Sequence, residues 1–148
     1  DYASYRGMLV MTGIDPKKDK DNEHIIVSED GKAAVWAGAI DDLWSMGKPT
    51  GKGGPWKNTL VKAGEVSDPY LIGFYDKKNL TLSHNSQKDV TFTIEVDPTG
   101  NGKWVNYATL TVKPGEKLAH ELKAPFQARW IRFISDSDTN ATAWLEYK

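Results

Sequence analysis

The chain has 148 residues, a length that fits one ordinary domain or one domain plus a fragment of another, and that can bury a core without metals or disulfides. It carries 19 Lys and Arg against 20 Asp and Glu, a net charge of -1 that makes nucleic acid an unexpected partner. It has no Cys, which excludes disulfides, thiolate zinc sites and cysteine nucleophiles, and it has no apolar run that predicts a membrane span.

The first third of the chain predicts short strands joined by polar loops. Strands are expected at residues 7–13, 24–27 and 33–36, with a polar loop at residues 15–22. The dipeptide Asp30-Gly31 between two apolar runs predicts a hairpin with a type I′ turn, which requires positive φ at both central residues. Because the chain enters a strand almost at once and shows no signal peptide, we expect it to begin inside a longer protein.

A Gly-rich connector at residues 47–55 separates this part from the rest of the sequence. Its glycines and Lys52 do not match the spacing of a phosphate-binding loop, so a linker is the preferred interpretation. We therefore expect a β-hairpin segment over residues 1–54 and a separate domain over residues 55–148.

The second part alternates apolar and polar residues with the period of a β-strand. Residues 90–96 place Val, Phe, Ile and Val on one face and Thr, Thr and Glu on the other. Gly-, Pro- and Asp-rich turns separate similar stretches at residues 80–83, 104–112, 128–134 and 141–147. No helical stripe is present, so any helix should be a single turn. The pattern predicts an all-β fold, an antiparallel β-sandwich of jelly-roll-like form.

Two groups of residues carry a family resemblance. Ser28-Glu29-Asp30-Gly31, followed by Trp36, resembles a degenerate copy of the hairpin repeat of sialidase-like β-propellers. Gly54-Pro55-Trp56-Lys57 and the stretches 67–71, 92–97 and 130–133 resemble the C-terminal region of propeller-type proteins from polysaccharide-degrading bacteria. The resemblance implies that residues 1–54 are a terminal propeller blade, or else the first strands of the sandwich. It also implies an extracellular or periplasmic setting of glycan breakdown, and it transfers no catalytic residue.

Aromatic residues are the strongest chemical signal, with 6 Trp, 6 Tyr and 4 Phe. An indole can cover the apolar face of a sugar ring while polar neighbours bind its hydroxyls. We place three tryptophans in the core. Trp130 and Trp144 lie in apolar strands, and Trp36 closes the predicted hairpin. The residues expected to bind carbohydrate lie in or beside polar segments and turns, with packing under a loop as the alternative: Trp44, Trp56, Trp104, Tyr70, Tyr75 and His84.

Metal and catalytic patterns are weak. The spacing of Asp136, Asp138 and Asn140 matches the start of a calcium loop, but the later ligands of such a loop are missing, so a hydrophilic hairpin loop is favoured. The three His residues have no metal-ligand spacing. No pair of carboxylates is recognisable as catalytic, and the adjacent Asp41 and Asp42 would point to opposite faces of a strand. We expect no cofactor, with calcium the weak exception.

These observations predict a non-catalytic, carbohydrate-associated β-sandwich that binds a polysaccharide or oligosaccharide, or structurally supports its recognition. One alternative is a fragment of a propeller-type glycoside hydrolase or polysaccharide lyase, in which case the rest of a longer parent chain is a further partner. Another is a structural surface or fibre subunit. Cooperative folding of the isolated sandwich would favour the first hypothesis over a severed propeller blade.

Overall fold

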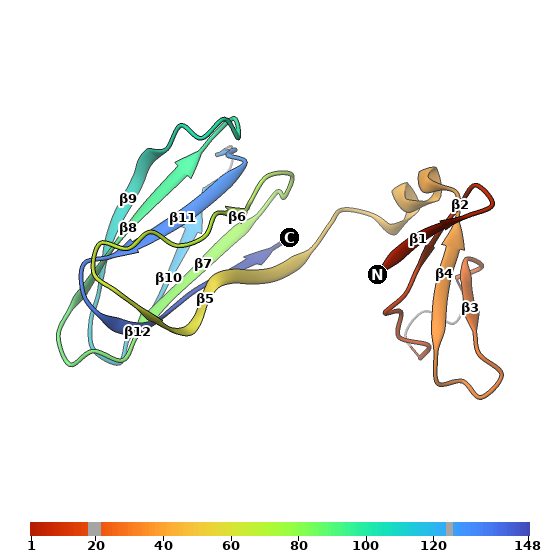
Figure 1. Ribbon diagram of the computed structural model, residues 1–148, viewed down its shortest axis with the longest axis horizontal. Helices are drawn as coiled ribbons and strands as arrows, with labels where there is room; N and C mark the ends of the chain where they lie inside the picture. The colour runs from red at the N-terminus through yellow and green to blue at the C-terminus, as the bar shows by residue number, and fades with distance from the viewer. Residues whose placement is uncertain (18–21, 124–125) are drawn as a thin grey trace. The chain divides into compact units, whose positions relative to one another are not determined.

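The computed structural model describes residues 1–17, 22–123 and 126–148, and its regular structure is almost entirely antiparallel β (Figure 1). The predicted all-β class is confirmed. The chain divides into two compact units, Asp1–Gly47 and Lys48–Lys148. Residues 18–21 of the predicted polar loop lie outside the described residues.

The first unit is a single four-stranded antiparallel sheet followed by a short 3₁₀ helix. Its strands are β1 (Tyr2–Tyr5), β2 (Met8–Met11), β3 (Ile25–Val27) and β4 (Ala34–Gly38), in the order β1-β2-β4-β3. The helix η1 (Ile40–Met46) has seven residues, about two turns of a 3₁₀ helix. The expected limit of a single turn is therefore wrong, and Asp41 and Asp42 lie in this helix rather than in a strand.

The predicted hairpin joins β3 to β4, with Val27 opposite Ala34. Its turn type differs from the expectation. Of the two central residues, Asp30 and Gly31, only Gly31 has a positive φ, of 68°. The loop is longer than two residues and is closed by the Ser28 N–H, which donates to the Ala33 carbonyl at 2.9 Å. A two-residue turn with positive φ at both positions occurs instead at Arg6-Gly7, which joins β1 to β2.

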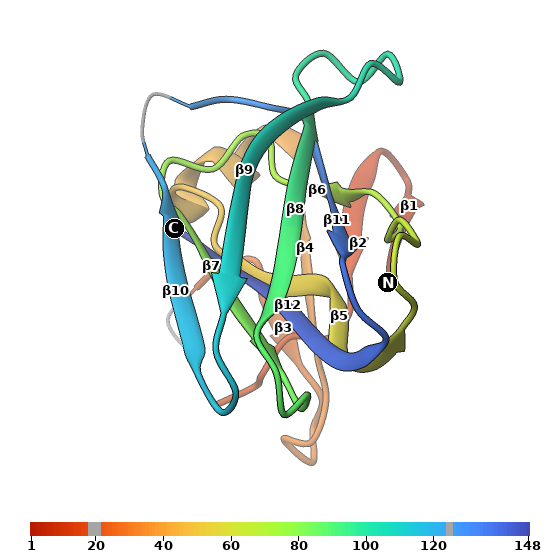
Figure 2. The same cartoon turned by 90° about the vertical axis from the view of Figure 1, so that its left-hand side faces the viewer.

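The second unit is a sandwich of eight strands: β5 (Gly51–Val61), β6 (Tyr70–Leu71), β7 (Lys78–His84), β8 (Val90–Asp97), β9 (Val105–Val112), β10 (Lys117–Leu122), β11 (Trp130–Ser135) and β12 (Thr139–Tyr147). They form two four-stranded antiparallel sheets, β10-β7-β12-β5 and β6-β11-β8-β9; Figure 2 shows the second of these in front. When the eight strands of this unit are renumbered from 1 (β5) to 8 (β12), the two sheets have the strand orders 6-3-8-1 and 2-7-4-5. This is the strand order of a jelly roll. The predicted sandwich is thus confirmed.

The core lies between the two sheets and is built from alternate residues of their strands. In β8 the expected apolar face is buried, and Phe92 and Ile94 are fully enclosed. In β11 the buried residues are Ile131 and Phe133, so Trp130 and Arg132 point to the outer face. In β12 the alternation likewise places Trp144 on the outer face. The expectation that Trp130 and Trp144 are core residues is therefore wrong, because each has the wrong parity for its strand.

The Gly-rich segment is not a free linker along its whole length. The compact units divide after Gly47, and residues 51–54 belong to β5, which pairs with β12. The expected boundary after residue 54 falls inside this strand. The glycines allow the backbone of β12 to approach closely, since a Cβ at Gly54 would lie 2.0 Å from the Ala143 carbonyl oxygen.

Candidate functional site

One end of the sandwich gathers the loops that follow β6 and β8 and the residues that precede β11 (Figure 2). At this end two indoles line a surface depression of about 460 Å³. Trp104 directly precedes β9, and Trp130 is the first residue of β11. Both side chains are partly exposed. The remaining lining residues are Pro69, Asp97, Gly100 and Gly102.

Asp97 organises the turn that forms one wall of the depression. Its Oδ1 accepts hydrogen bonds from the N–H groups of Gly100 at 2.8 Å, Thr99 at 3.2 Å and Asn101 at 3.3 Å, and its Oδ2 accepts from Gly102 at 2.7 Å. Gly100 packs so closely on the β11 side that a Cβ there would lie 2.6 Å from Arg129 Cδ. The hydrogen bonds to Asp97 thus define the conformation of this wall.

The same hydrogen bonds set the charge of Asp97. Burial of the carboxylate, which is 2 % exposed, opposes its ionisation, but the four backbone donors outweigh burial and hold the pKa of Asp97 below its usual value of 3.8. Because the folded pKa is lowered, the ionised Asp97 stabilises the fold above pH 3.8, and this contribution is lost as the pH falls through the folded pKa.

We expect Asp97→Asn to lower the melting temperature by several degrees at pH 7, because the turn loses charge-assisted hydrogen bonds. The difference from the wild type should shrink as the pH falls through the lowered pKa of Asp97. Thermal melts followed by circular dichroism across this range test the prediction. Asp89→Asn, at an exposed residue, is the control. A difference in melting temperature that does not change with pH would contradict the assigned role.

Trp104 is held in place by a charged pair on the outer face of the sheet. Arg132 lies with Cζ 4.2 Å from the centroid of the indole ring, a cation–π contact. Its Nε donates to Glu95 Oε2 at 2.6 Å, and the two residues are direct partners on β11 and β8. These contacts hold the indole in one orientation. The sequence alone did not identify Arg132 or Trp130 as members of the site.

Two residues expected to bind carbohydrate are buried and make structural contacts. Trp56 is 6 % exposed and packs in the core against Phe92 and Phe133, with ring centroids 6.3 and 5.9 Å away. His84 is buried, its Nε2 lies 2.9 Å from the Val112 carbonyl oxygen, and its Nδ1 accepts the Ser86 N–H at 3.1 Å. Both point inward from their strands. The expectation that Trp56 is an exposed indole is wrong, and carbohydrate binding by either residue stays a prediction.

The other expected residues occupy different places. Tyr70 and Tyr75 stack on Tyr147, at centroid distances of 6.5 and 4.2 Å. Tyr75 also lines a neighbouring depression of about 450 Å³ that shares the turn after Asp97. Trp44 is 85 % exposed but lies on η1 in the first unit. Of the predicted set, Trp104 alone lines the two-indole depression.

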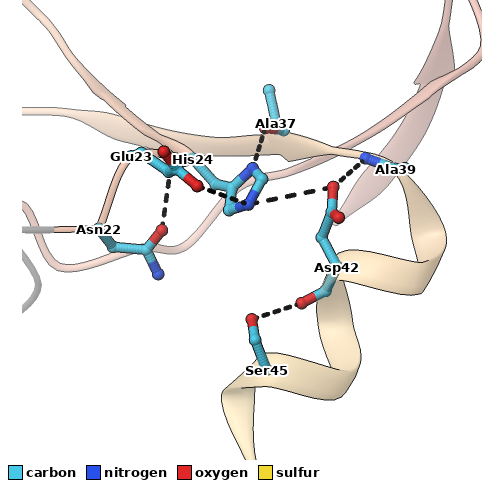
Figure 3. A network of polar contacts seen from close by, with 7 residues as sticks. All are labelled: Asn22, Glu23, His24, Ala37, Ala39, Asp42 and Ser45. Atoms are coloured by element: carbon cyan, nitrogen blue, oxygen red, sulfur yellow. Dashed lines mark hydrogen bonds and ion pairs between the residues drawn. The ribbon is translucent and has the colours of Figure 1, made fainter.

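The first unit contains a polar cluster that ties η1 to the sheet (Figure 3). Asp42 Oδ2 accepts the Ala39 N–H at 2.7 Å and lies 3.9 Å from His24 Nε2. His24 Nδ1 is 3.2 Å from the Ala37 carbonyl oxygen, and its ring packs on the buried Trp36 with centroids 5.1 Å apart. These contacts give the cluster a structural role. The placement of Trp36 in the core is confirmed.

The weak calcium candidate serves as a loop connector. Asp138 Oδ1 accepts the Ala63 N–H at 2.8 Å, Asp136 accepts the Ser137 hydroxyl, and the Asn140 N–H donates to Asn85. Within residues 1–17, 22–123 and 126–148, no group of three or more His, Asp or Glu side chains is arranged to hold a metal ion. Calcium binding at Asp136, Asp138 and Asn140 stays an untested possibility of the sequence.

No protein-family model and no curated protein matches this chain. The relation to propeller-type proteins therefore stays a prediction. In the part of the chain that the structure describes, the helical content includes no segment with the length and apolarity to cross a membrane.

Proposed function

We propose that the sandwich unit, Lys48–Lys148, is a non-catalytic module that binds a polysaccharide or oligosaccharide at the depression formed by Trp104 and Trp130. The observation that carries this proposal is the pairing of two partly exposed indoles in one depression with a hydrogen-bonded wall. Sugar rings present apolar C–H faces that pack on aromatic rings, and nearby backbone and carboxylate groups can orient their hydroxyls. An extracellular or periplasmic location belongs to the same proposal.

The state of the carboxylates supports binding over catalysis. Glycoside hydrolysis uses two carboxyl groups that reach the scissile bond, one of which must donate a proton. At this depression Asp97 is almost fully buried and saturated by backbone donors, and its lowered pKa disfavours the protonated form. Glu95 is held by Arg132. Asp97 is therefore a poor general acid.

One observation favours the alternative in which the first unit is part of a larger protein. The first unit is a single sheet with several strongly exposed apolar side chains, and a sheet of this kind is normally covered by another layer. The most exposed of them are Tyr2, Ile26, Ile40 and Trp44. The order β1-β2-β4-β3 differs from the sequential strand order of a propeller blade, so the binding module remains our first proposal.

The proposal predicts that Trp104→Ala weakens binding of a glycan identified on an array by roughly tenfold or more, the ratio that corresponds to about 1.4 kcal/mol. The reason is the loss of the stacking surface. Trp104→Tyr keeps a ring and should retain part of the affinity. Isothermal titration calorimetry measures the change, and thermal melts verify that the variants are folded.

Trp44→Ala is the matched control, since it removes an exposed indole from the first unit. It should bind the glycan as the wild type does. If Trp104→Ala and Trp130→Ala both bound the glycan with unchanged affinity, the assigned site would be wrong.

A further inference from the structure

The outer face of the sheet β10-β7-β12-β5 carries a second indole in a polar setting. Trp144 lines a depression of about 430 Å³ there. The depression is formed by the outward residues of four adjacent strands, so its floor is a hydrogen-bonded sheet rather than a loop. Nothing in the first proposal uses these residues.

The strand register explains how polar groups come to surround the ring. Thr81 on β7 is the direct partner of Trp144, and Ser83 is the partner of Thr142 two pairs further along, on the same face of the sheet. Lys117 on β10 is in turn the partner of Ser83. Direct partners lie about 4.5–5.5 Å apart at Cβ, so the Thr81 hydroxyl lies beside the indole, while Ser83 and Lys117 lie on the same face further along the strands.

The charge of this depression is positive. Three lysines line it, Lys52, Lys57 and Lys117, against one carboxylate, Glu146. Lys57 Nζ lies 4.9 Å from the centroid of the Trp144 ring. Among the residues that the structure describes, no carboxylate forms an ion pair with these lysines. Glu121, on the same outward side of β10 as Lys117, faces Asn79 beyond the lining residues.

This charge distinguishes the face from the Trp104 depression. There the cation beside the indole, Arg132, is already neutralised by Glu95. Beside Trp144 the cations remain available for a ligand. An indole flanked by lysines and hydroxyl groups complements a sugar ring that carries an anionic substituent.

We infer that this outer face is a second carbohydrate site, specific for acidic sugars that carry a carboxylate or a sulfate. Trp144 stacks on the sugar ring, Lys57 and Lys117 bind the anion, and Thr81 and Ser83 bind hydroxyl groups. The inference rests on the proposed function for the class of ligand, but it uses different residues on the opposite sheet.

The test uses the full chain with two acidic probes, polygalacturonic acid for the carboxylate and heparin for the sulfate. Calorimetry or affinity electrophoresis should show binding to at least one probe, and the probe that binds identifies the anion. Trp144→Ala should weaken it by roughly tenfold or more. Lys57→Gln combined with Lys117→Gln should weaken it and flatten its dependence on salt, while Lys88→Gln, an exposed lysine in another loop, should change neither.

Binding of neither acidic probe would overturn the inference, as would unchanged binding in Trp144→Ala, which would indicate attraction to lysines alone. The lysine variants keep the test decisive if Trp144→Ala does not fold. Neutral and acidic probes are measured side by side on Trp104→Ala and Trp144→Ala. A protein that binds an acidic probe but no neutral glycan would contradict the proposed site at Trp104 and leave this inference standing.

Discussion

Trp56→Ala is expected to lower the free energy of unfolding of the sandwich by about 3–5 kcal/mol, the usual cost of truncating a large buried aromatic residue. Trp56 projects from β5 into the core, where it packs against Phe92 of β8 and Phe133 of β11. It therefore joins the two sheets. Its removal leaves a cavity that these rings cannot fill without moving the strands that carry them.

Chemical denaturation followed by far-ultraviolet circular dichroism measures this loss. Trp144→Ala is the matched control, because it removes the same side chain from the outer face of the adjacent strand β12. Trp144→Ala should lower the free energy of unfolding much less, since Trp144 faces solvent and its neighbours can relax around the smaller side chain. Equal losses for the two variants would contradict the assignment of Trp56 to the core and Trp144 to the surface.

Gly54→Ala is expected to destabilise the sandwich by about 3 kcal/mol, at the upper end of the usual cost of inserting a methyl group into a packed site. The added Cβ would lie 2.0 Å from the carbonyl oxygen of Ala143 and 2.9 Å from the carbonyl carbon of the same residue. These atoms belong to the backbone of β12, so the clash cannot be relieved by rotating a side chain. The two strands would have to separate locally.

The control for this prediction is Gly51→Ala on the same strand. There the nearest atom to an added Cβ would be Tyr147 Cδ2 at 3.7 Å, an ordinary contact, and little change in stability should follow. Urea denaturation of both variants separates the outcomes. A Gly54→Ala protein as stable as Gly51→Ala would show that β5 and β12 do not approach as closely as described.

The alternation of apolar residues predicted much of the sandwich. Val90 to Val96 place one clear apolar face inward, and the stretches around Leu80, Trp130 and Ala141 form strands as expected. Four strands were not predicted. β1, β6 and β10 are short or carry few apolar residues, and β5 is rich in glycine and has irregular pairing with β12, which breaks its period.

The faces of the tryptophans were predictable in part. In β12, Trp144 shares its parity with Thr142 and Glu146, whereas Ala143 and Leu145 share the buried one. The alternation of the strand therefore predicts an outward Trp144. The hydrophobicity of the indole had instead favoured a place in the core. The sequence around Trp56 gave no such signal. Its glycines indicated a linker, whereas in the structure Gly54 allows β5 to pack closely on β12.

The candidate site depends on contacts that sequence spacing does not reveal. The turn after Asp97 was predicted, but its carboxylate as a fourfold acceptor was not. Arg132 and Trp104 are 28 positions apart and meet only because β11, β8 and β9 are neighbours in one sheet. Such pairs follow from strand order, which the local pattern does not determine.

Titration of the isotope-labelled protein with a glycan selected on an array, followed through its six indole N–H signals by NMR, tests the central claim most directly. Each signal can be assigned from the Trp variants. Binding at the proposed depression predicts that the signals of Trp104 and Trp130 shift with the added glycan, whereas those of the buried Trp36 and Trp56 stay in place. Saturable binding that leaves both the Trp104 and Trp130 signals unmoved would contradict it.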